Sequence, residues 1–219
     1  MTPDERGPIG LLGGSFDPIH IGHVQLARDA MQQLGLARVL FVPAGVAWQK
    51  GAATDGTHRA RMIELAIADE PRFVLDRREL VRPGPSFTLD TLRQLRQQVG
   101  HERPLVLLIG ADQFGRLDTW HRWEELIELA HLAVAERPGH TEPLRPALAA
   151  WRAQHLGSAA DVALRPAGAQ VPIAMTPVGC SSTQIRALLR SASPQAASTV
   201  QGLLVPGVLD YIRQHRLYS

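Results

Sequence analysis

The chain has 219 residues, of which 45% are hydrophobic, and a formal net charge of +2. This length and apolar content suffice for one substantial core, so a single domain over 1–219 is expected. The balanced charge gives no indication of a nucleic-acid-binding surface, and no apolar stretch is long enough to span a membrane. A single cysteine, Cys180, and an N-terminus unlike a signal peptide predict a cytoplasmic protein.

The first predicted elements are a buried strand at residues 9–12, a glycine-rich turn, and an amphipathic helix over 24–34. The turn reads Gly13-Gly14-Ser15-Phe16-Asp17-Pro18-Ile19-His20-Ile21-Gly22-His23. A glycine turn that leads into a helix N-terminus binds anions, because free backbone N–H groups and the helix dipole point at the ligand. Such turns also occur for packing reasons alone. The combination of Gly-Gly, Phe-Asp-Pro and His-x-Gly-His favours a phosphate site here.

Two histidines of this turn are the first candidate catalytic residues. His20 and His23 are three residues apart, so they share one face if both lie in the first helical turn. Their imidazoles can donate hydrogen bonds to phosphate oxygens and to charge that builds up during a reaction.

The whole run resembles the signature of the nucleotidylyltransferase superfamily and, more narrowly, that of bacterial nicotinate-nucleotide adenylyltransferases. The resemblance implies that His20 and His23 bind the phosphates of ATP and stabilise the transition state. It also implies an ATP site that includes Gly13, Gly14, Ser15, Phe16, Asp17 and Gly22.

Residues 38–42 form a second predicted strand, and the alternation of strand and helix patterns predicts a Rossmann-like, doubly wound parallel sheet of the α/β class. Residues 44–57 lack a helical period and are expected to form a loop at the C-terminal edge of the sheet, where such folds bind ligands. Lys50, the only lysine of the chain, lies in this loop. Most lysines are simply solvated. The resemblance instead implies a contact with the triphosphate, because family members carry a Pro-Pro-His-Lys-like segment here, of which Ala47-Trp48-Gln49-Lys50 keeps the lysine alone.

The next stretch is predicted to contain a helix over 57–70 capped by Thr57, a short strand at 73–75 and a polar connection at 77–85. Arg59 and Arg61 on this helix are expected at the surface or against a neighbouring helix, with no functional role.

A further helix is predicted over 86–99, with Ser86 or Thr88 as its N-cap. Capping alone explains these hydroxyl residues. The segment also resembles the family's Ser-Tyr-Thr-x-Asp-Thr motif, whose backbone near the threonine holds the nicotinate carboxylate. Thr88 matches that threonine, and Phe87 replaces the tyrosine, which keeps the ring and loses the hydroxyl.

Residues 105–109 are apolar throughout, as expected for a central parallel strand that is buried on both faces. Asp112, in the Gly110-Ala111-Asp112 run that follows, can act as a simple helix cap. The resemblance implies instead that Gly110 borders ATP and that Asp112 and Ser15 help to place the substrate nucleotide. It also implies that the ring of Trp120 packs on the pyridine, and Trp123 is assigned to the core.

A helix over 124–130 and strands at 131–135 and 171–175 complete the predicted sheet. The long connection at 140–170 changes to Pro, Ala, Arg and Gly, with a helical patch around 148–155, and is expected to be a surface excursion without chemistry. Its histidines, His140 and His155, are expected to be solvated.

The second strong motif is Cys180-Ser181-Ser182-Thr183-Gln184-Ile185-Arg186. Small hydroxyl residues that open a helix expose N–H groups to an anion, and an arginine can donate to phosphate bidentately. Taken on its own, the segment is better explained by an ordinary N-cap with a surface arginine. It resembles the family's Ile-Ser-Ser-Thr-x-Ile-Arg signature, which implies ATP binding by Ser181, Ser182, Thr183 and Arg186. A last helix, within 205–218, resembles the end of the family's sequence.

The resemblance implies adenylyl transfer from ATP to nicotinate mononucleotide, with release of pyrophosphate. Catalysis by His20, His23, Lys50 and Arg186 would rest on positioning and charge stabilisation, and Mg²⁺ would arrive with ATP without a metal site of the protein's own. The alternatives are the same chemistry with nicotinamide mononucleotide or with an acceptor such as pantetheine phosphate. From a different class, the chain could be a non-catalytic nucleotide-binding regulator. No nucleic-acid or membrane partner is expected, and a homo-oligomer stays open.

Overall fold

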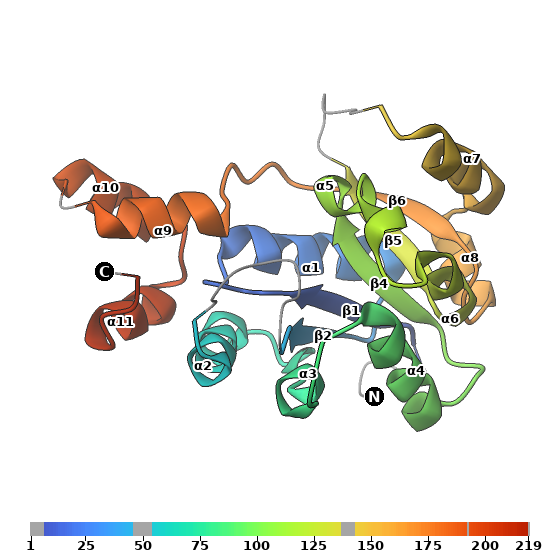
Figure 1. The fold of residues 1–219 in the computed structure, drawn as a ribbon, viewed down its shortest axis with the longest axis horizontal. Helices are drawn as coiled ribbons and strands as arrows, with labels where there is room; N and C mark the ends of the chain where they lie inside the picture. Colours follow the sequence, from blue (N-terminus) through green and yellow to red (C-terminus); the bar gives the residue numbers. More distant parts are fainter. Residues whose placement is uncertain (1–6, 46–53, 137–142, 192, 219) are drawn as a thin grey trace.

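The computed structural model describes residues 7–45, 54–136, 143–191 and 193–218 (Figure 1). Within these residues, six parallel strands form one sheet in the order β3-β2-β1-β4-β5-β6. The strands are β1 (Ile9–Gly14), β2 (Arg38–Pro43), β3 (Phe73–Leu75), β4 (Leu105–Gly110), β5 (His131–Glu136) and β6 (Gln170–Ala174). The strand order reverses between β1 and β4, which confirms the predicted doubly wound Rossmann-like architecture and creates a crevice at the C-terminal ends of these two strands.

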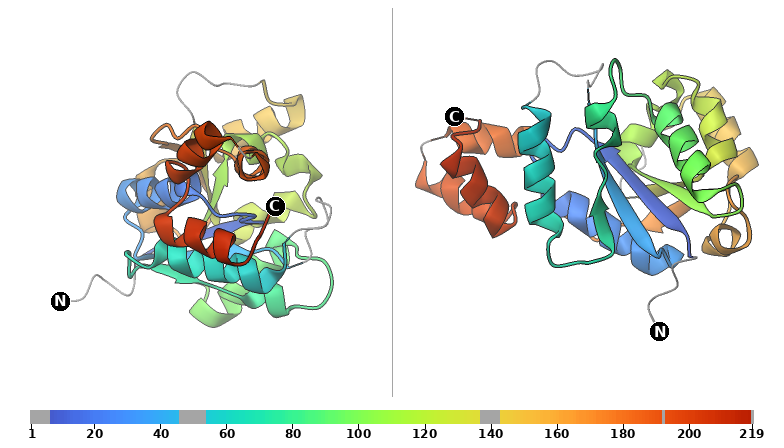
Figure 2. Two further views of the ribbon diagram at one scale, coloured as in Figure 1. Left: turned by 90° about the vertical axis from the view of Figure 1, so that its left-hand side faces the viewer. Right: turned by 90° about the horizontal axis from the view of Figure 1, so that it is seen from below.

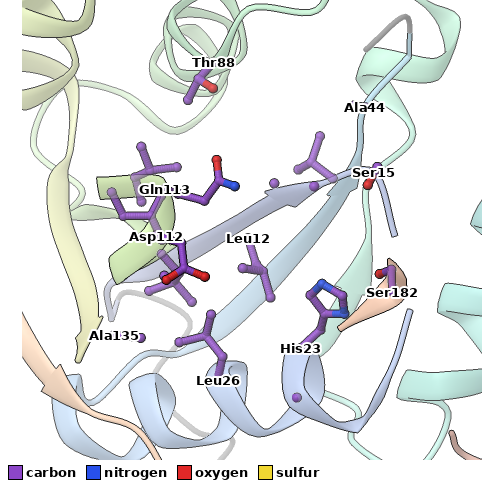
Figure 3. Close-up of a pocket in the computed structure, with 18 of the residues that line it drawn as sticks. Leu12, Ser15, His23, Leu26, Ala44, Thr88, Asp112, Gln113, Ala135 and Ser182 are labelled. Carbon is purple, nitrogen blue, oxygen red and sulfur yellow. The ribbon is translucent and has the colours of Figure 1, made fainter. Parts of the chain in front are cut away.

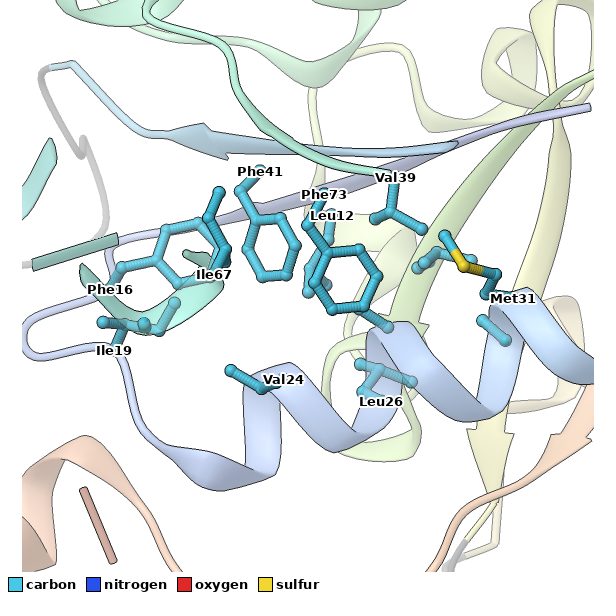
Figure 4. Packing of buried hydrophobic residues seen from close by; sticks show 14 of the residues in the cluster. Leu12, Phe16, Ile19, Val24, Leu26, Met31, Val39, Phe41, Ile67 and Phe73 are labelled. Atoms are coloured by element: carbon cyan, nitrogen blue, oxygen red, sulfur yellow. The ribbon is translucent and has the colours of Figure 1, made fainter. Parts of the chain in front are cut away.

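Both faces of the sheet are buried because successive residues of each central strand point to opposite sides. Leu12 of β1 and Phe41 of β2 belong to one apolar cluster, whereas Leu11 and Leu40 belong to the other. Figure 4 shows the first cluster, in which the rings of Phe16, Phe41 and Phe73 lie between the strands and the first helix. These two layers of apolar side chains fix the sheet between its helices.

The helices divide between the two faces. The first cluster receives buried side chains from α1 (Ile21–Leu34), α2 (Gly56–Ile67), α8 (Ala159–Leu164), α9 (Ser182–Arg190), α10 (Pro194–Gln201) and α11 (Pro206–Gln214). The second receives them from α4 (Thr88–Val99), α5 (Ala111–Phe114), α6 (Leu126–Leu129), α7 (Pro146–His155) and the 3₁₀ turn η1 (Leu117–Thr119). The views in Figure 2 show α11 alongside α2, although these two helices lie far apart in the sequence. No helix in the described ranges is both long and apolar enough to cross a membrane.

Several predicted helix starts are wrong by a few residues. Helix α1 begins at Ile21 and not at Val24, which makes His20 its N-cap. Helix α2 is capped by Asp55, whose Oδ1 accepts a hydrogen bond of 2.8 Å from the backbone N–H of Thr57, so the predicted cap at Thr57 is wrong.

The predicted cap of α4 is also wrong. The N-cap is Phe87, which makes no side-chain cap, and Ser86 Oγ instead accepts from the backbone N–H of Gly45 at 3.1 Å. The hydroxyl of Ser86 therefore links the segment before α4 to the segment after β2, and it does not cap α4.

Two predicted connections contain regular structure. The stretch 77–85 includes the short helix α3 (Arg78–Val81). The stretch 140–170 includes α7, which matches the helical patch predicted at 148–155 and begins two residues earlier, and α8, which was not predicted. Leu148, Trp151 and Val162 are buried there, so both helices are anchored in the core. His155 is not merely solvated, because its ring stacks on Trp151 with centroids 4.5 Å apart. Helix α7 contributes to the second apolar cluster and α8 to the first.

Candidate active site

A cavity of about 440 Å³ opens at the C-terminal edge of the sheet, where the strand order reverses. Its walls come from the ends of β1 and β4, the first turns of α1 and α9, and the segment that precedes α4. In Figure 3, Ser15, His23 and Ser182 lie around one end of the cavity, and Asp112 and Gln113 lie across from them. Fourteen of the predicted site residues line it: Gly13, Gly14, Ser15, His20, Gly22, His23, Thr88, Gly110, Asp112, Trp120, Ser181, Ser182, Thr183 and Arg186.

The two histidines stand at the N-terminus of α1, with ring centroids 3.8 Å apart. The backbone N–H of His20 donates to Nδ1 of His23 at 3.3 Å. A neutral His23 whose Nδ1 accepts a hydrogen bond carries its proton on Nε2. The chain therefore holds His23 in the tautomer that can donate through Nε2.

Gly22 allows the close packing around His20. A Cβ at this position would lie 3.1 Å from both His20 Nδ1 and Cys180 Sγ, which is tighter than ordinary van der Waals contact. Cys180 Sγ itself is 3.2 Å from His20 Nδ1. The glycine between the two histidines thus lets the segment before α9 lie directly against the start of α1.

Helix α9 meets α1 through its own N-terminus. Ser181 caps α9 by accepting from the backbone N–H of Gln184 at 3.2 Å, and the Ser182 hydroxyl donates to the carbonyl of Pro18 at 3.0 Å. Arg186 Nη1 donates to the carbonyl of Asp17 at 2.7 Å. Two helix N-termini therefore face the same end of the cavity, which favours an anion there through exposed N–H groups and both helix dipoles.

Phe16 and Asp17, both predicted in the ATP site, are not among the residues that line the cavity. Phe16 is buried in the first apolar cluster and its ring meets His23 edge-on at 5.0 Å. The carboxylate of Asp17 accepts from the Tyr218 hydroxyl at 2.6 Å and from the backbone N–H of Thr54 at 3.3 Å. Both side chains thus contact other parts of the protein, and these contacts help to hold the segment that lines the cavity in place.

The opposite end of the cavity carries aromatic and acidic groups. Phe87 stacks on His121 with centroids 4.5 Å apart, and Trp120 lines the same end. Glu79, in α3, also lines the cavity, and burial raises the pKa of its carboxyl group. The Thr91 hydroxyl donates to Glu79 Oε1 at 2.6 Å. Trp123 packs against Trp151 at 5.4 Å, as predicted for a core residue.

Lys50 lies outside the described residues, so its predicted contact stays a prediction. In the part of the chain that is described, no three His, Cys, Asp or Glu side chains gather closely enough to hold a metal ion.

Sequence reasoning missed several residues that shape the site, and Arg59 is the clearest. It is 3% exposed and donates to the carbonyls of Ser15 at 2.9 Å and of Ala44 and Thr54 at 2.8 Å. Its position, three and four residues before the buried Met62 and Ile63, places it on the inner face of α2 and could have identified it. Glu79 and His121 carried no comparable local signal, and Tyr218 belongs to the C-terminal segment that resembles the end of the family's sequence, without an assigned role.

The fold and the paired helix N-termini define a nucleotidyltransferase, and residues 11–188 match the cytidylyltransferase-like family. The chain is 44% identical over 221 residues to a probable nicotinate-nucleotide adenylyltransferase of Laribacter hongkongensis (100% of this chain, 97% of the relative). It is 41% identical to another from Dechloromonas aromatica (96% and 97%). The chain therefore belongs to the nicotinate-nucleotide adenylyltransferase family.

Solved structures share the fold. The nicotinic acid mononucleotide adenylyltransferase of Plasmodium falciparum, complexed with NaAD, superposes with a TM-score of 0.75 at 19% identity and covers 97% of both chains. A Vibrio parahaemolyticus structure described as a putative nicotinate-nucleotide adenylyltransferase gives a TM-score of 0.63 at 15% identity, with 97% of this chain and 95% of that chain covered.

Proposed function

We propose that the chain transfers the adenylyl group of ATP to nicotinate mononucleotide. An oxygen of the mononucleotide's 5′-phosphate forms a bond to the α-phosphorus of ATP, the bond from that phosphorus to the β-phosphate oxygen breaks, and pyrophosphate leaves. The product is nicotinate adenine dinucleotide. The observation that carries the proposal is the meeting of His20, His23 and Arg186 with two helix N-termini at one end of a single cavity.

The histidine end of the cavity suits the triphosphate. Nε2 of His23 carries the ring proton, and so can donate, because Nδ1 accepts from the backbone, and the dipoles of α1 and α9 both favour an anion at this end. Donors fixed in this way stabilise the charge that develops on the α-phosphate without having to reorganise during the reaction. Such positioning requires no covalent protein intermediate. Arg186, and Lys50 by resemblance, would bind the departing pyrophosphate.

The other end suits a pyridine nucleotide. The Trp120 ring lines the cavity and offers a flat apolar surface to the pyridine, and Thr88 opens α4 beside it. Asp112 and Ser15 would contact the nucleotide between the two ends. His121 also lines the cavity, and its ring can donate a hydrogen bond to a carboxylate, which would favour a carboxylate-bearing ring over a carboxamide.

The residues of this site are compatible with Mg²⁺ that enters bound to ATP. The phosphate end is lined by histidines, hydroxyl groups and an arginine, a donor set that binds phosphate oxygens and leaves the cation to those oxygens and to water. When bound, Mg²⁺ supplies neutralisation of the triphosphate charge. A substrate such as ATP also agrees with the predicted cytoplasmic location.

Pyrophosphate release, measured with ATP and each acceptor in turn, tests the proposal. We expect the highest kcat/KM with nicotinate mononucleotide and lower values with nicotinamide mononucleotide and pantetheine phosphate. His20→Ala and His23→Ala should each lower kcat by about 100-fold or more, the usual loss when a transition-state donor is removed. The matched control is His101→Ala, an exposed histidine that precedes β4 at the other edge of the sheet.

Three outcomes contradict the proposal. If either histidine variant made the dinucleotide at the wild-type rate, the proposed catalytic role of that histidine would be wrong. If another acceptor gave a higher kcat/KM, nicotinate mononucleotide would not be the preferred substrate. Tight ATP binding without any turnover would favour the nucleotide-binding regulator.

A further inference from the structure

Tyr218 contacts the turn that precedes α1 although 201 positions separate it from Asp17. Its hydroxyl donates a hydrogen bond of 2.6 Å to Asp17 Oδ1. Burial, reinforced by the bond to Asp17, raises the pKa of Tyr218 well above its usual range. The phenol therefore keeps its proton at neutral pH and remains a donor to this carboxylate.

Asp17 is held from three separate parts of the chain. Besides Tyr218, the backbone N–H of Thr54 donates to Asp17 Oδ2 at 3.3 Å, and Arg186 Nη1 donates to its carbonyl at 2.7 Å. Both carboxylate oxygens thus have partners within the protein, and the residue is 8% exposed. A charged group in such a place holds its position only while its partners remain.

Arg59 extends the same network on the far side of the turn. It donates to the carbonyls of Ser15, Ala44 and Thr54, so it joins the turn to the described residues on either side of 46–53. Burial lowers the pKa of the Arg59 guanidinium, and the charge of Asp17 opposes this effect. Two of the residues that this network fixes, Ser15 and Arg186, line the cavity.

We propose that Tyr218 is a positioning residue for the phosphate end of the site. It acts through Asp17, whose carbonyl accepts a hydrogen bond from Arg186 and which lies three positions before His20 in the turn. Tyr218 itself is not among the residues that line the cavity. This inference rests on the proposed function for its kinetic readout and on the contacts above for its geometry.

Tyr218→Phe removes the hydroxyl and keeps the ring. Loss of this donor loosens Asp17 and, through its carbonyl, Arg186, so we expect kcat/KM for ATP to fall about tenfold, equivalent to about 1.4 kcal/mol. The KM for nicotinate mononucleotide should change less than twofold, because Thr88, Asp112 and Trp120, which are proposed to bind it, make no contact with Tyr218 or Asp17 in this network. The matched control is Tyr211→Phe on α11, which removes a hydroxyl that pairs with His58 Nδ1 at 2.9 Å, away from Asp17. Its kinetic constants should stay within twofold of the wild type.

A double-mutant cycle with Asp17→Asn tests whether Tyr218 acts through Asp17. If it does, the double variant loses no more activity than Asp17→Asn alone, whereas additive losses would overturn the inference. A Tyr218→Phe variant that melts at a lower temperature but keeps its kcat/KM for ATP would show a merely structural role and would also overturn it.

Calorimetric binding of a non-hydrolysable ATP analogue separates this inference from the proposed function. We expect a severalfold higher Kd for Tyr218→Phe than for Tyr211→Phe and the wild type. If the wild type binds the analogue without turning over substrates, the proposed function fails while this comparison still decides the role of Tyr218. Equal Kd values in all three proteins would contradict that role.

Discussion

His121 and Phe87 form a stacked pair at the acceptor end of the cavity, and the imidazole is the half of the pair that can bind a carboxylate. Glu79 and Asp112 also line the cavity, and neither carboxyl group can donate to a carboxylate when ionised. Binding of the proposed nicotinate carboxylate there would need an N–H donor, and a histidine ring N–H can be that donor.

We expect His121→Phe to raise the KM for nicotinate mononucleotide by about tenfold or more, as for the loss of one hydrogen bond to a charged group. The new ring preserves the stacking, so the KM for nicotinamide mononucleotide and that for ATP should change less than twofold. Steady-state kinetics with both acceptors measures this selectivity. His155→Phe is the control, because His155 also stacks on an aromatic ring, that of Trp151, outside the cavity lining. An unchanged ratio of the two acceptor KM values would exclude a role for His121.

The residues that the sequence identifies are those whose partners are close along the chain. The spacing of His20 and His23 predicts their shared face, and the rings do lie together. Tyr218 could not be recognised in this way, because its role depends on a partner 201 positions away. The motif also predicts that Asp17 belongs to the ATP site. A motif of this kind does not show which way a side chain points.

Among the elements, α4 shows how one side chain can stabilise several loops. Arg96 is buried on this helix and donates to the carbonyls of Leu129 at 2.7 Å, Arg103 at 2.5 Å and Pro166 at 2.6 Å. Burial lowers the pKa of the Arg96 guanidinium. Its backbone partners belong to segments just before β4, β5 and β6, so one charge fixes the N-terminal edge of half the sheet.

Arg96→Met should lower the free energy of unfolding by about 3 kcal/mol, because buried carbonyls lose their donors. For a chain of this size the melting temperature should fall by about 6–12 °C. The control is Arg93→Met on the same helix, whose exposed ion pair with Glu125 is worth about 1 kcal/mol or less. Equal melting temperatures for the two variants would show that the carbonyl contacts of Arg96 contribute little.

The strands and helices agree with the prediction wherever the hydrophobic pattern of the sequence is strong. The apolar runs of β1, β4 and β5 were predicted within one or two residues, because strands buried on both faces leave few polar positions. The pattern was weak for α7 and α8, where alanines dominate and Leu148, Trp151 and Val162 are the buried anchors. Caps were predicted poorly because a serine or threonine hydroxyl has several possible partners, as the bond from Gly45 to Ser86 shows.

For the molecule as a whole, His131 makes stability depend on pH. It is fully buried, its Nε2 is 2.9 Å from the carbonyl of Arg165, and its Nδ1 accepts from the backbone N–H of Ala169 at 3.2 Å. This arrangement requires the neutral ring with its proton on Nε2. Burial lowers the pKa of His131 in the folded chain below the ordinary value of 6.5. As the pH falls below 6.5, the unfolded chain binds a proton that the folded chain does not, so stability is lost.

Chemical denaturation at pH 7.5 and 5.5 measures this effect. The free energy of unfolding should decrease toward pH 5.5, by up to about 1.4 kcal/mol per pH unit below 6.5. His131→Gln, which can still donate and accept, should reduce the decrease, whereas His101→Gln at an exposed position should not. Glu79, whose pKa is raised, contributes with the opposite sign, so the difference between variants is the relevant quantity. Identical pH profiles for the wild type and His131→Gln would contradict the prediction.

The phosphate end of the cavity joins the turn before α1 to residues between 182 and 218, which a ribosome adds much later. A nascent chain that has reached β6 already contains all six strands of the described sheet, yet it still lacks Ser182, Arg186 and Tyr218. Nucleotide capture is therefore a late event in biosynthesis. A polypeptide released early by a stalled ribosome would keep the sheet sequence without the means to sequester ATP.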